Sequence, residues 1–286
     1  MEINNLEVII PAYNEEENIA NVIKGIRETL GNGCRITIVD DASEDRTLEI
    51  ARANGAQVIR HPYRMGNGAA IKTGLRQAQA ELLVLMDADN QHLPQDIPLL
   101  LTHIDKFDMV IGARDFSKFS LRNLANRFYN GFASYVTLFN IQDLTCGFRA
   151  VRRKEAIKFI YLLPNTFSSP STLTLAFLKT GRAIIYTPVS SLPRPHGKSK
   201  INLLNDGVRF FLIITRIATF FSPLRVFLPI SILFFLTGFL YYLYTFFAFH
   251  RFTNMSALLF TTSLIIFILG LISEQISQLR MDRTEG

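Results

Sequence analysis

The chain has 286 residues, a net charge of +6 and a mean hydropathy of +0.21. Its hydrophobic content of 49% is high for a soluble protein, and its two cysteines give no basis for a disulfide framework and favour a reducing compartment. The mild basic excess makes nucleic acid a poor candidate partner, and it fits a membrane surface or a phosphorylated substrate better.

The first 115 residues alternate between strand-like and helix-like segments. Short apolar runs rich in β-branched residues predict strands, and apolar residues spaced three or four apart predict helices. The expected strands are 7–10, 35–39, 57–60, 81–86 and 109–111, and the expected helices are 15–30, 47–54, 67–80 and 96–105. This order predicts an α/β fold with a mainly parallel, Rossmann-like sheet covered by helices on both faces. Residues 1–200 are predicted to form this domain, with less regular structure after residue 115.

Polar residues follow four of the predicted strands, where the carboxyl ends of parallel strands meet. A single acid in such a place is usually a helix cap or a turn residue, but paired acids at several strand ends indicate one polar cleft. The four groups are Pro11 to Glu15, Asp40 with Asp41, Asp87 with Asp89, and Gly112 to Arg114.

The turn after residues 81–86 carries Asp87 and Asp89 one residue apart, followed by Gln91. Two carboxylates and an amide oxygen suit Mg²⁺ or Mn²⁺, which take their remaining ligands from phosphate and water. A calcium loop would need more acids and a central glycine. The turn is therefore predicted to hold a divalent cation together with a diphosphate.

Two further features have a functional and a plain interpretation. Residues 66–73 are one residue away from a phosphate-binding loop, because Ile71 stands where its second glycine is needed. We interpret this stretch as a helix start near phosphate. Residues 114–154 are rich in basic side chains, which indicate either a solvated face or an anion site beside the acidic cleft.

The C-terminal part predicts a membrane anchor. Residues 226–249 and 255–273 carry no charge and would be roughly 36 and 28 Å long as helices, against a hydrocarbon core of about 30 Å. We expect spans over about 226–249 and 255–276 within a segment 224–286. The positive-inside rule places both termini in the cytoplasm, because the connecting loop has a single arginine.

Residues 201–223 are apolar but interrupted by charges, which predicts an amphipathic helix at the membrane interface. The alternative is a soluble helix packed on the first domain. Within the spans, Gly238 and Gly270 could mediate association into a homo-oligomer.

Taken in order, four motifs resemble glycosyltransferase family 2: residues 9–15 (IIPAYNE), 39–43 (VDDAS), 87–92 (DADNQH) and 146–149 (CGFR). The resemblance covers residues 5–200 and is closest to polyprenyl-phosphate hexosyltransferases of the dolichyl-phosphate mannose synthase type and their bacterial glucosyl relatives. Leu93-Pro94 departs from the family, in which many members carry two prolines there. With no tryptophan, the chain cannot carry the Q-x-x-R-W motif of processive polysaccharide synthases.

The resemblance implies a GT-A fold, a nucleotide-sugar donor and inversion at the anomeric carbon. It assigns Asp87, Asp89 and Gln91 to the metal, and Asp89, Asp143 and Arg149 to catalysis, with Asp143 near the reacting sugar and Arg149 on phosphate. The implied nucleotide-sugar residues are Pro11, Tyr13, Glu15, Asp40, Asp41, Asp87, Arg194, Ser199 and Lys200, and the lipid-phosphate residues are Arg114, Arg122 and Arg127.

The expected reaction is transfer of a hexose from a nucleotide sugar to a polyprenyl phosphate at the cytoplasmic membrane face. UDP-glucose is the favoured donor and GDP-mannose the next. One alternative is transfer to a lipid hydroxyl, with Asp143 as general base. Another is a non-catalytic membrane scaffold that binds nucleotide sugars.

Overall fold

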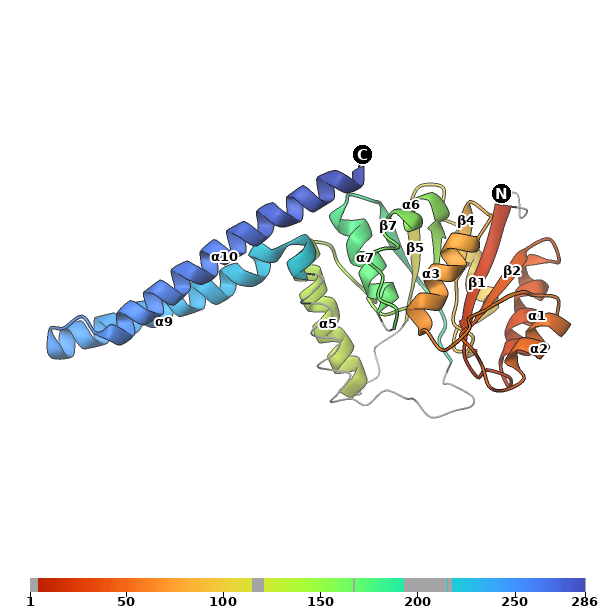
Figure 1. Cartoon of the computed structure of the whole chain (residues 1–286), viewed down its shortest axis with the longest axis horizontal. Helices are drawn as coiled ribbons and strands as arrows, with labels where there is room; N and C mark the ends of the chain where they lie inside the picture. The colour runs from red at the N-terminus through yellow and green to blue at the C-terminus, as the bar shows by residue number, and fades with distance from the viewer. Residues whose placement is uncertain (1–4, 115–120, 167, 193–214, 216–217, 286) are drawn as a thin grey trace. The chain divides into compact units, whose positions relative to one another are not determined.

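The computed structural model of the chain describes residues 5–114, 121–166, 168–192, 215 and 218–285 (Figure 1). The chain divides into two units, Met1–Phe210 and Phe211–Gly286. The boundary predicted after residue 200, and most of the interfacial helix predicted over 201–223, lie outside the described residues.

The first unit is built on a seven-stranded sheet in the order β3-β2-β1-β4-β6-β5-β7 (Figure 1). All neighbouring strands run parallel except β6, which is antiparallel to both β4 and β5. The predicted α/β fold with a mainly parallel sheet is confirmed, although β6 and β7 lie where no strand was expected. The strands are β1 Leu6–Ala12, β2 Arg35–Asp40, β3 Gln57–Arg60, β4 Leu82–Leu85, β5 Met109–Ala113, β6 Arg149–Arg152 and β7 Ile184–Pro188.

Helices between the strands shield the sheet from water. Every residue of β1 and β4 is buried, as expected of central strands covered on both faces. Gly74 of α3 packs so closely on β1 that a Cβ there would lie 2.3 Å from Ile9 Cγ2. The helices of this unit are α1 Ile19–Leu30, α2 Thr47–Ala53, α3 Asn67–Gln77, the 3-10 turn η2 Pro94–Asp96, α4 Ile97–Leu101, α5 Leu121–Thr137, α6 Arg153–Lys158 and α7 Ser169–Lys179.

The second unit contains two long apolar helices, α9 (Pro223–Phe249) and α10 (Asn254–Glu285), which pack against each other. Both contain a stretch long and apolar enough to cross a membrane, Pro223–Phe249 and Asn254–Leu279, and few side chains of these stretches are buried. The helices coincide closely with the two predicted spans.

Small residues recur every seven positions along both helices and form their contact. Ser231 and Ser263 each donate a hydroxyl hydrogen bond to the other's carbonyl, at 2.9 Å in both directions. A Cβ at Gly238 would lie 2.9 Å from Leu259 Cβ, and one at Gly270 would lie 2.8 Å from Phe227 Cβ. Both glycines therefore permit close packing inside the hairpin, and the association between copies that the sequence suggested for them stays a prediction. The buried small residues are Ser231, Gly238 and Thr245 on α9, and Ser256, Ser263, Gly270 and Ser277 on α10.

Candidate functional site

The acid pair after β4 lies at the carboxyl edge of the sheet. Asp87 and Asp89 are both half-buried, and the Gln91 N–H donates to Asp89 Oδ1 at 3.2 Å. Asn90, directly after the pair, takes a left-handed φ of 58°, so the chain turns sharply after Asp89. Gly147 lies against this turn, because a Cβ there would stand 2.7 Å from Asp87 Oδ2.

The donor atoms of this turn fit a hard divalent cation. Among the described residues, no group of three or more His, Cys, Asp and Glu side chains could hold a metal by itself. A cation at Asp87 and Asp89 would therefore complete its shell from outside the chain, as Mg²⁺ and Mn²⁺ do with phosphate oxygens and water. The residues present fit that chemistry and do not fit a closed structural metal site.

Arg114, directly after β5, forms a bidentate ion pair with Asp143. Its Nε lies 2.7 Å from Asp143 Oδ2 and its Nη2 lies 3.0 Å from Oδ1, and Nη2 also donates to Thr145 Oγ1 at 2.8 Å. Burial acts to lower the pKa of Arg114, but the hydrogen bonds and charge of Asp143 outweigh it and raise the pKa. The guanidinium is thus a fixed positive charge near the acid turn.

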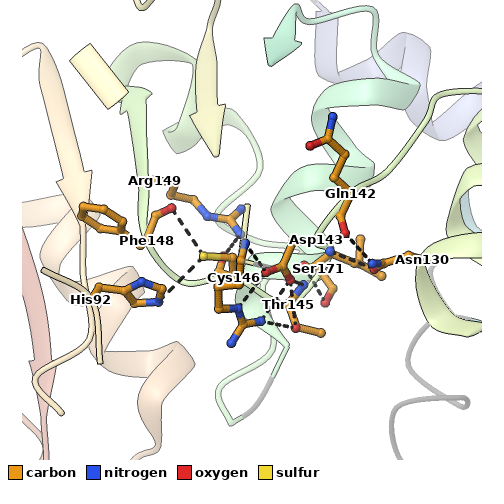
Figure 2. Close-up of polar contacts among 11 residues, drawn as sticks. His92, Asn130, Gln142, Asp143, Thr145, Cys146, Phe148, Arg149 and Ser171 are labelled. Carbon is orange, nitrogen blue, oxygen red and sulfur yellow. Dashed lines mark hydrogen bonds and ion pairs between the residues drawn. The ribbon is translucent and has the colours of Figure 1, made fainter. Parts of the chain in front are cut away.

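Asp143 is almost fully buried and is surrounded by donors (Figure 2). In addition to Arg114, the Thr145 N–H donates to its Oδ1 at 3.1 Å. The side chain of Asn130 in α5 hydrogen-bonds the two residues that flank Asp143 in the chain. It donates to the Gln142 carbonyl at 2.6 Å and accepts from the Leu144 N–H at 3.0 Å. These contacts hold the carboxylate as a partner for a cationic side chain.

His92 forms the floor behind the acid turn. Its ring stacks on Phe148 with centroids 5.1 Å apart, and Cys146 Sγ lies 3.8 Å from its Nε2 (Figure 2). Burial, followed by the charge of Arg114, lowers the pKa of His92 to about 4, so the ring is neutral at physiological pH. Burial likewise raises the pKa of the Cys146 thiol to about 12, so this cysteine is a packing residue and not a nucleophile.

Arg149 does not reach the cleft, contrary to the role that the sequence resemblance implied for it. It lies in the central strand β6, and its side chain is fully buried. One nitrogen donates to the Pro170 carbonyl at 2.9 Å and to Thr174 Oγ1 at 3.2 Å, and another donates to the Cys146 carbonyl. Burial lowers its pKa. With no accessible surface, Arg149 cannot contact a phosphate here; it ties α7 to the loop that carries Gly147.

Asp40, the last residue of β2, and Asp41, which follows it, are both buried. Asp41 accepts hydrogen bonds from the N–H groups of Met65 and Gly66, both at 2.8 Å, and its Oδ1 lies 2.8 Å from His61 Nδ1. Asp40 accepts from the Ser43 N–H at 3.2 Å. These acids therefore fix the loop that leads into α3.

The end of β1 carries Pro11, Tyr13 and Glu15. Pro11 is buried inside the strand, while Tyr13 and Glu15 are half-buried beyond it. The Arg64 guanidinium lies over the Tyr13 ring, 4.1 Å from its centre, in a cation–π contact. The Glu15 N–H donates to Thr47 Oγ1 at 2.8 Å, so this loop is joined to the start of α2.

The start of α3 does not offer its N–H groups to a phosphate. The Gly68 N–H donates to the Thr166 carbonyl at 2.9 Å, and the Ala69 N–H donates to the Asn165 carbonyl at 2.8 Å. A Cβ at Gly68 would lie 2.1 Å from the Pro164 carbonyl oxygen. The glycines here permit close packing of two chain segments, and the predicted phosphate role of this helix start is not supported.

Other predicted residues lie apart from this cluster or outside the described part of the chain. Arg127 is exposed on α5. The side chain of Arg122 and all of Arg194, Ser199 and Lys200 lie outside the described residues. Conversely, sequence reasoning missed Gly147, His61 and Asn130, whose contacts depend on segments far apart in the chain; only Gly147, inside a recognised motif, carried a signal.

Two family models match the chain. The model "Glycosyl transferase family 2" matches residues 7–159, and the model "GtrB C-terminal hairpin" matches residues 222–279. The first covers more than half of the chain and contains β1 to β6 with the acid turn. The second coincides with α9 and most of α10.

Individual proteins agree with these matches. An uncharacterised protein of Methanocaldococcus jannaschii is 30% identical over 73% of this chain and 91% of its own length. An undecaprenyl-phosphate 4-deoxy-4-formamido-L-arabinose transferase of Edwardsiella ictaluri is 29% identical over 77% of this chain and 69% of its own length. A polyprenol monophosphomannose synthase of Mycolicibacterium smegmatis is 29% identical over 72% of this chain and 84% of its own length.

Among solved structures, glucosyl-3-phosphoglycerate synthase from Mycobacterium tuberculosis, in complex with Mn²⁺, UDP and phosphoglyceric acid, is similar with a TM-score of 0.63. The sequence identity is 18%, and the match covers 75% of this chain and 78% of that one, so it establishes a shared GT-A-like fold. With the family model matched across β1 to β6, the chain belongs to glycosyl transferase family 2, and it carries the GtrB-type hairpin at its C-terminal end.

Proposed function

We propose that this glycosyltransferase moves a hexose from a nucleotide sugar to the phosphate of a polyprenyl phosphate at the cytoplasmic membrane face, with UDP-glucose the favoured donor and GDP-mannose the next. One observation carries the proposal: a half-exposed acid pair at the sheet edge, next to a fixed arginine, in a chain with two membrane-length helices. The names of two relatives, an undecaprenyl-phosphate transferase and a polyprenol monophosphomannose synthase, support the acceptor class. The lone arginine between the spans supports cytoplasmic termini.

The donor diphosphate is proposed to meet the turn that carries Asp87, Asp89 and Gln91. When bound there, Mg²⁺ or Mn²⁺ supplies positive charge that stabilises the diphosphate as it leaves. The Mn²⁺–UDP complex of the structurally similar synthase supports a divalent cation. Gly147 would keep the Asp87 carboxylate in position, since any larger residue collides with it.

The nucleotide is proposed to lie along the ends of β1 and β2. Tyr13 offers a ring surface there, with Pro11 and Glu15 beside it. Asp40 and Asp41 would support these strand ends from within, because both are buried and bonded to protein donors. The proposed residues that close over the diphosphate from outside the described segments are Arg194, Ser199 and Lys200.

The acceptor phosphate is proposed to approach Arg114, with Arg122 and Arg127 nearby on the chain. A phosphate is already an anion at neutral pH, so attack on the anomeric carbon, with inversion, needs no general base. Catalysis then depends on in-line positioning and on charge stabilisation of the leaving group. Asp143 would orient the Arg114 guanidinium, which it binds at 2.7 and 3.0 Å.

Transfer to a lipid hydroxyl receives less support. A hydroxyl acceptor needs a base that can reach its proton. Asp143 was the obvious candidate, but it is 1% exposed and both of its oxygens accept hydrogen bonds from Arg114. The geometry therefore favours the phosphate acceptor.

The experiment is an assay of the full chain in lipid nanodiscs with a panel of labelled UDP- and GDP-sugars, undecaprenyl phosphate and Mn²⁺ or Mg²⁺. Label should enter the lipid phase with one donor, and chelation of the cation with EDTA should abolish it. Full transfer in excess chelator would refute the metal assignment. Transfer to diacylglycerol and none to undecaprenyl phosphate would refute the acceptor.

A further inference from the structure

The loop between β3 and α3 is held firmly at both of its ends. At its start, Asp41 Oδ1 lies 2.8 Å from His61 Nδ1, and His61 Nε2 lies 2.9 Å from Thr73 Oγ1 of α3. At its end, the same carboxylate accepts the N–H groups of Met65 and Gly66, both at 2.8 Å. The backbone of this loop therefore has a fixed path along the sheet edge.

The middle of the loop carries two exposed side chains, Tyr63 and Arg64. The Arg64 guanidinium lies over the ring of Tyr13, 4.1 Å from its centre. Since Tyr13 is half-buried and Arg64 is exposed, the guanidinium covers the ring on its solvent side. The loop does not need this contact for its position, because the Asp41 carboxylate already holds both of its ends.

Tyr13 directly follows β1 and lies next to the end of β2. The last residue of β1, Ala12, pairs with Asp40 of β2, and the Asp41 N–H donates to the Ala12 carbonyl at 2.9 Å. Beyond Tyr13, the Asn14 N–H donates to Ser43 Oγ at 3.0 Å, which joins this turn to the segment after β2. The Tyr13 ring thus stands where the proposed nucleotide lies, along the ends of these two strands.

The ring and the guanidinium are two flat surfaces of the kind that bind nucleobases. Proteins stack bases on aromatic rings and on arginine guanidinium planes. Stacked layers lie about 3.5 Å apart, so a base between the two surfaces would place them about 7 Å apart. The guanidinium would have to move outward by about 3 Å from its present position. The long, exposed side chain of Arg64 can make this movement while the loop backbone stays in place.

We propose that Arg64 holds the base of the donor nucleotide against the Tyr13 ring, as the outer surface of a stacking site. This inference rests on the proposed function, because it takes the donor to be a nucleotide sugar, and it deepens that function by assigning a residue to the base. Arg64 lies outside the four motifs of the family resemblance. A stack contacts the face of a base, so the site would hold the uracil of UDP or the guanine of GDP.

The test measures the binding of UDP, GDP and pyrophosphate to the full chain in lipid nanodiscs with Mn²⁺, by isothermal titration calorimetry. Pyrophosphate is the probe for the phosphate part of the nucleotide alone. Arg64→Ala should raise the Kd for UDP and for GDP at least about fivefold and leave the Kd for pyrophosphate unchanged. The matched control is Arg76→Ala, at an exposed arginine in the last turn of α3, and it should bind all three probes normally.

The variant Arg64→Trp separates a flat surface from a charge. Indole is planar and uncharged, so this variant should bind UDP within about twofold of the unmodified chain. It also contains the chain's one tryptophan, whose fluorescence reports the stack. UDP should quench this indole at least about threefold more than the indole of Tyr63→Trp, because the Arg64 side chain faces the Tyr13 ring.

An equal loss of UDP and pyrophosphate affinity in Arg64→Ala would overturn the stacking site, since Arg64 would then bind phosphate by its charge. Unchanged UDP affinity in this variant would also overturn it and would make the contact with Tyr13 a structural one. Both results would leave the proposed sugar transfer standing, because the unmodified chain would still bind nucleotide. An unmodified chain that bound neither UDP nor GDP would overturn both proposals. A chain that showed the expected binding and transferred no sugar would refute the transfer alone.

Discussion

Two pairs of acids lie at the ends of β2 and β4, the strands on either side of β1, and the two pairs differ in burial and in hydrogen bonding. Asp40 and Asp41, after β2, are buried, and Asp41 alone accepts two backbone N–H groups and contacts a histidine. Asp87 and Asp89, after β4, keep part of their surface accessible beside Gly147. The first pair is held inside the protein, and the second pair, which we propose for the cation and the diphosphate, keeps accessible surface.

The same contrast separates two arginines that the sequence had placed together on phosphate. Arg114 is partly accessible and paired with Asp143, whereas Arg149 is fully enclosed and bonded to main-chain carbonyls. Of two arginines assigned to phosphate by resemblance, only Arg114 therefore has surface that a substrate could contact, while Arg149 joins segments of the fold. Burial and hydrogen-bond partners distinguish the two roles, and they make the contrast testable.

The largest effect is expected for Asp89→Asn, which keeps the shape of the side chain and removes its charge. Loss of a metal-binding carboxylate should lower kcat/KM about 10³-fold, or ~4 kcal/mol, in the nanodisc transfer assay. The thermal midpoint should shift by less than about 2 °C, because the side chain is half-exposed. Asp105→Asn, at an exposed acid preceding β5, is the matched control and should change neither quantity. A large fall in the thermal midpoint with Asp89→Asn would show that Asp89, like Asp41, supports the fold.

The opposite pattern is expected for Asp41→Ala. Removing this carboxylate leaves the half-buried backbone N–H groups of Met65 and Gly66, and the buried His61, without the partner that they share. The free energy of unfolding should fall by about 3 to 4 kcal/mol, measured by thermal or chemical unfolding in detergent. Glu44→Ala, at an exposed neighbouring acid, should cost less than about 0.5 kcal/mol. An Asp41 variant as stable as the unmodified chain would show that this acid does not support the fold.

The neutral state of the buried His92 ring, which lies next to the acid turn, can be tested by the pH dependence of stability. Burial lowers the pKa of His92 to about 4, against about 6.5 in the unfolded chain. Between these values the unfolded chain binds a proton that the folded chain does not, so stability should decrease as pH falls from 6.5 to 4, by about 3 kcal/mol in total. His92→Phe keeps the stacking on Phe148 and should lose this part of the slope in thermal midpoints measured from pH 7 to 4.5. Parallel curves for the two proteins would contradict the buried, neutral histidine.

The smallest effect is expected for Gly147→Ala. Its Cβ would stand 2.7 Å from Asp87 Oδ2, so the carboxylate must move by a few tenths of an ångström or more. The Kd for Mn²⁺, measured by electron paramagnetic resonance of free Mn²⁺, should rise about tenfold, or ~1.4 kcal/mol. Gly131→Ala, where no atom lies within 4 Å of the new Cβ, is the control and should bind Mn²⁺ normally. Equal affinity in both variants would show that Gly147 does not position Asp87.

Much of the first domain could be predicted from the sequence because its signals are local. Hydrophobic runs and helical spacing located β1 to β5 and the helices between them, with boundary errors of a few residues. The acid turn was found because Asp87, Asp89 and Gln91 are adjacent in the chain. The two spans were equally visible, since their length and lack of charge suffice.

The rest depended on contacts between distant segments. The antiparallel strand β6 is short and begins with Arg149, so nothing in its pattern indicated a central strand. Gly238 and Gly270 looked suited to contacts between copies, yet each packs against the partner helix of its own hairpin. The glycines at the start of α3 looked suited to phosphate, yet the Gly66 N–H donates to the Asp41 carboxylate and the Gly68 N–H to the Thr166 carbonyl, about a hundred residues away.

By itself, the sequence determined the family, the α/β order, the acid turn and the membrane hairpin, because each of these depends on the pattern of residues close together in the chain. Only the tertiary structure decided which charged groups keep accessible surface and which are enclosed in the fold. That decision rests on burial and on hydrogen-bond partners, and both are set by segments that come together only when the sheet is assembled.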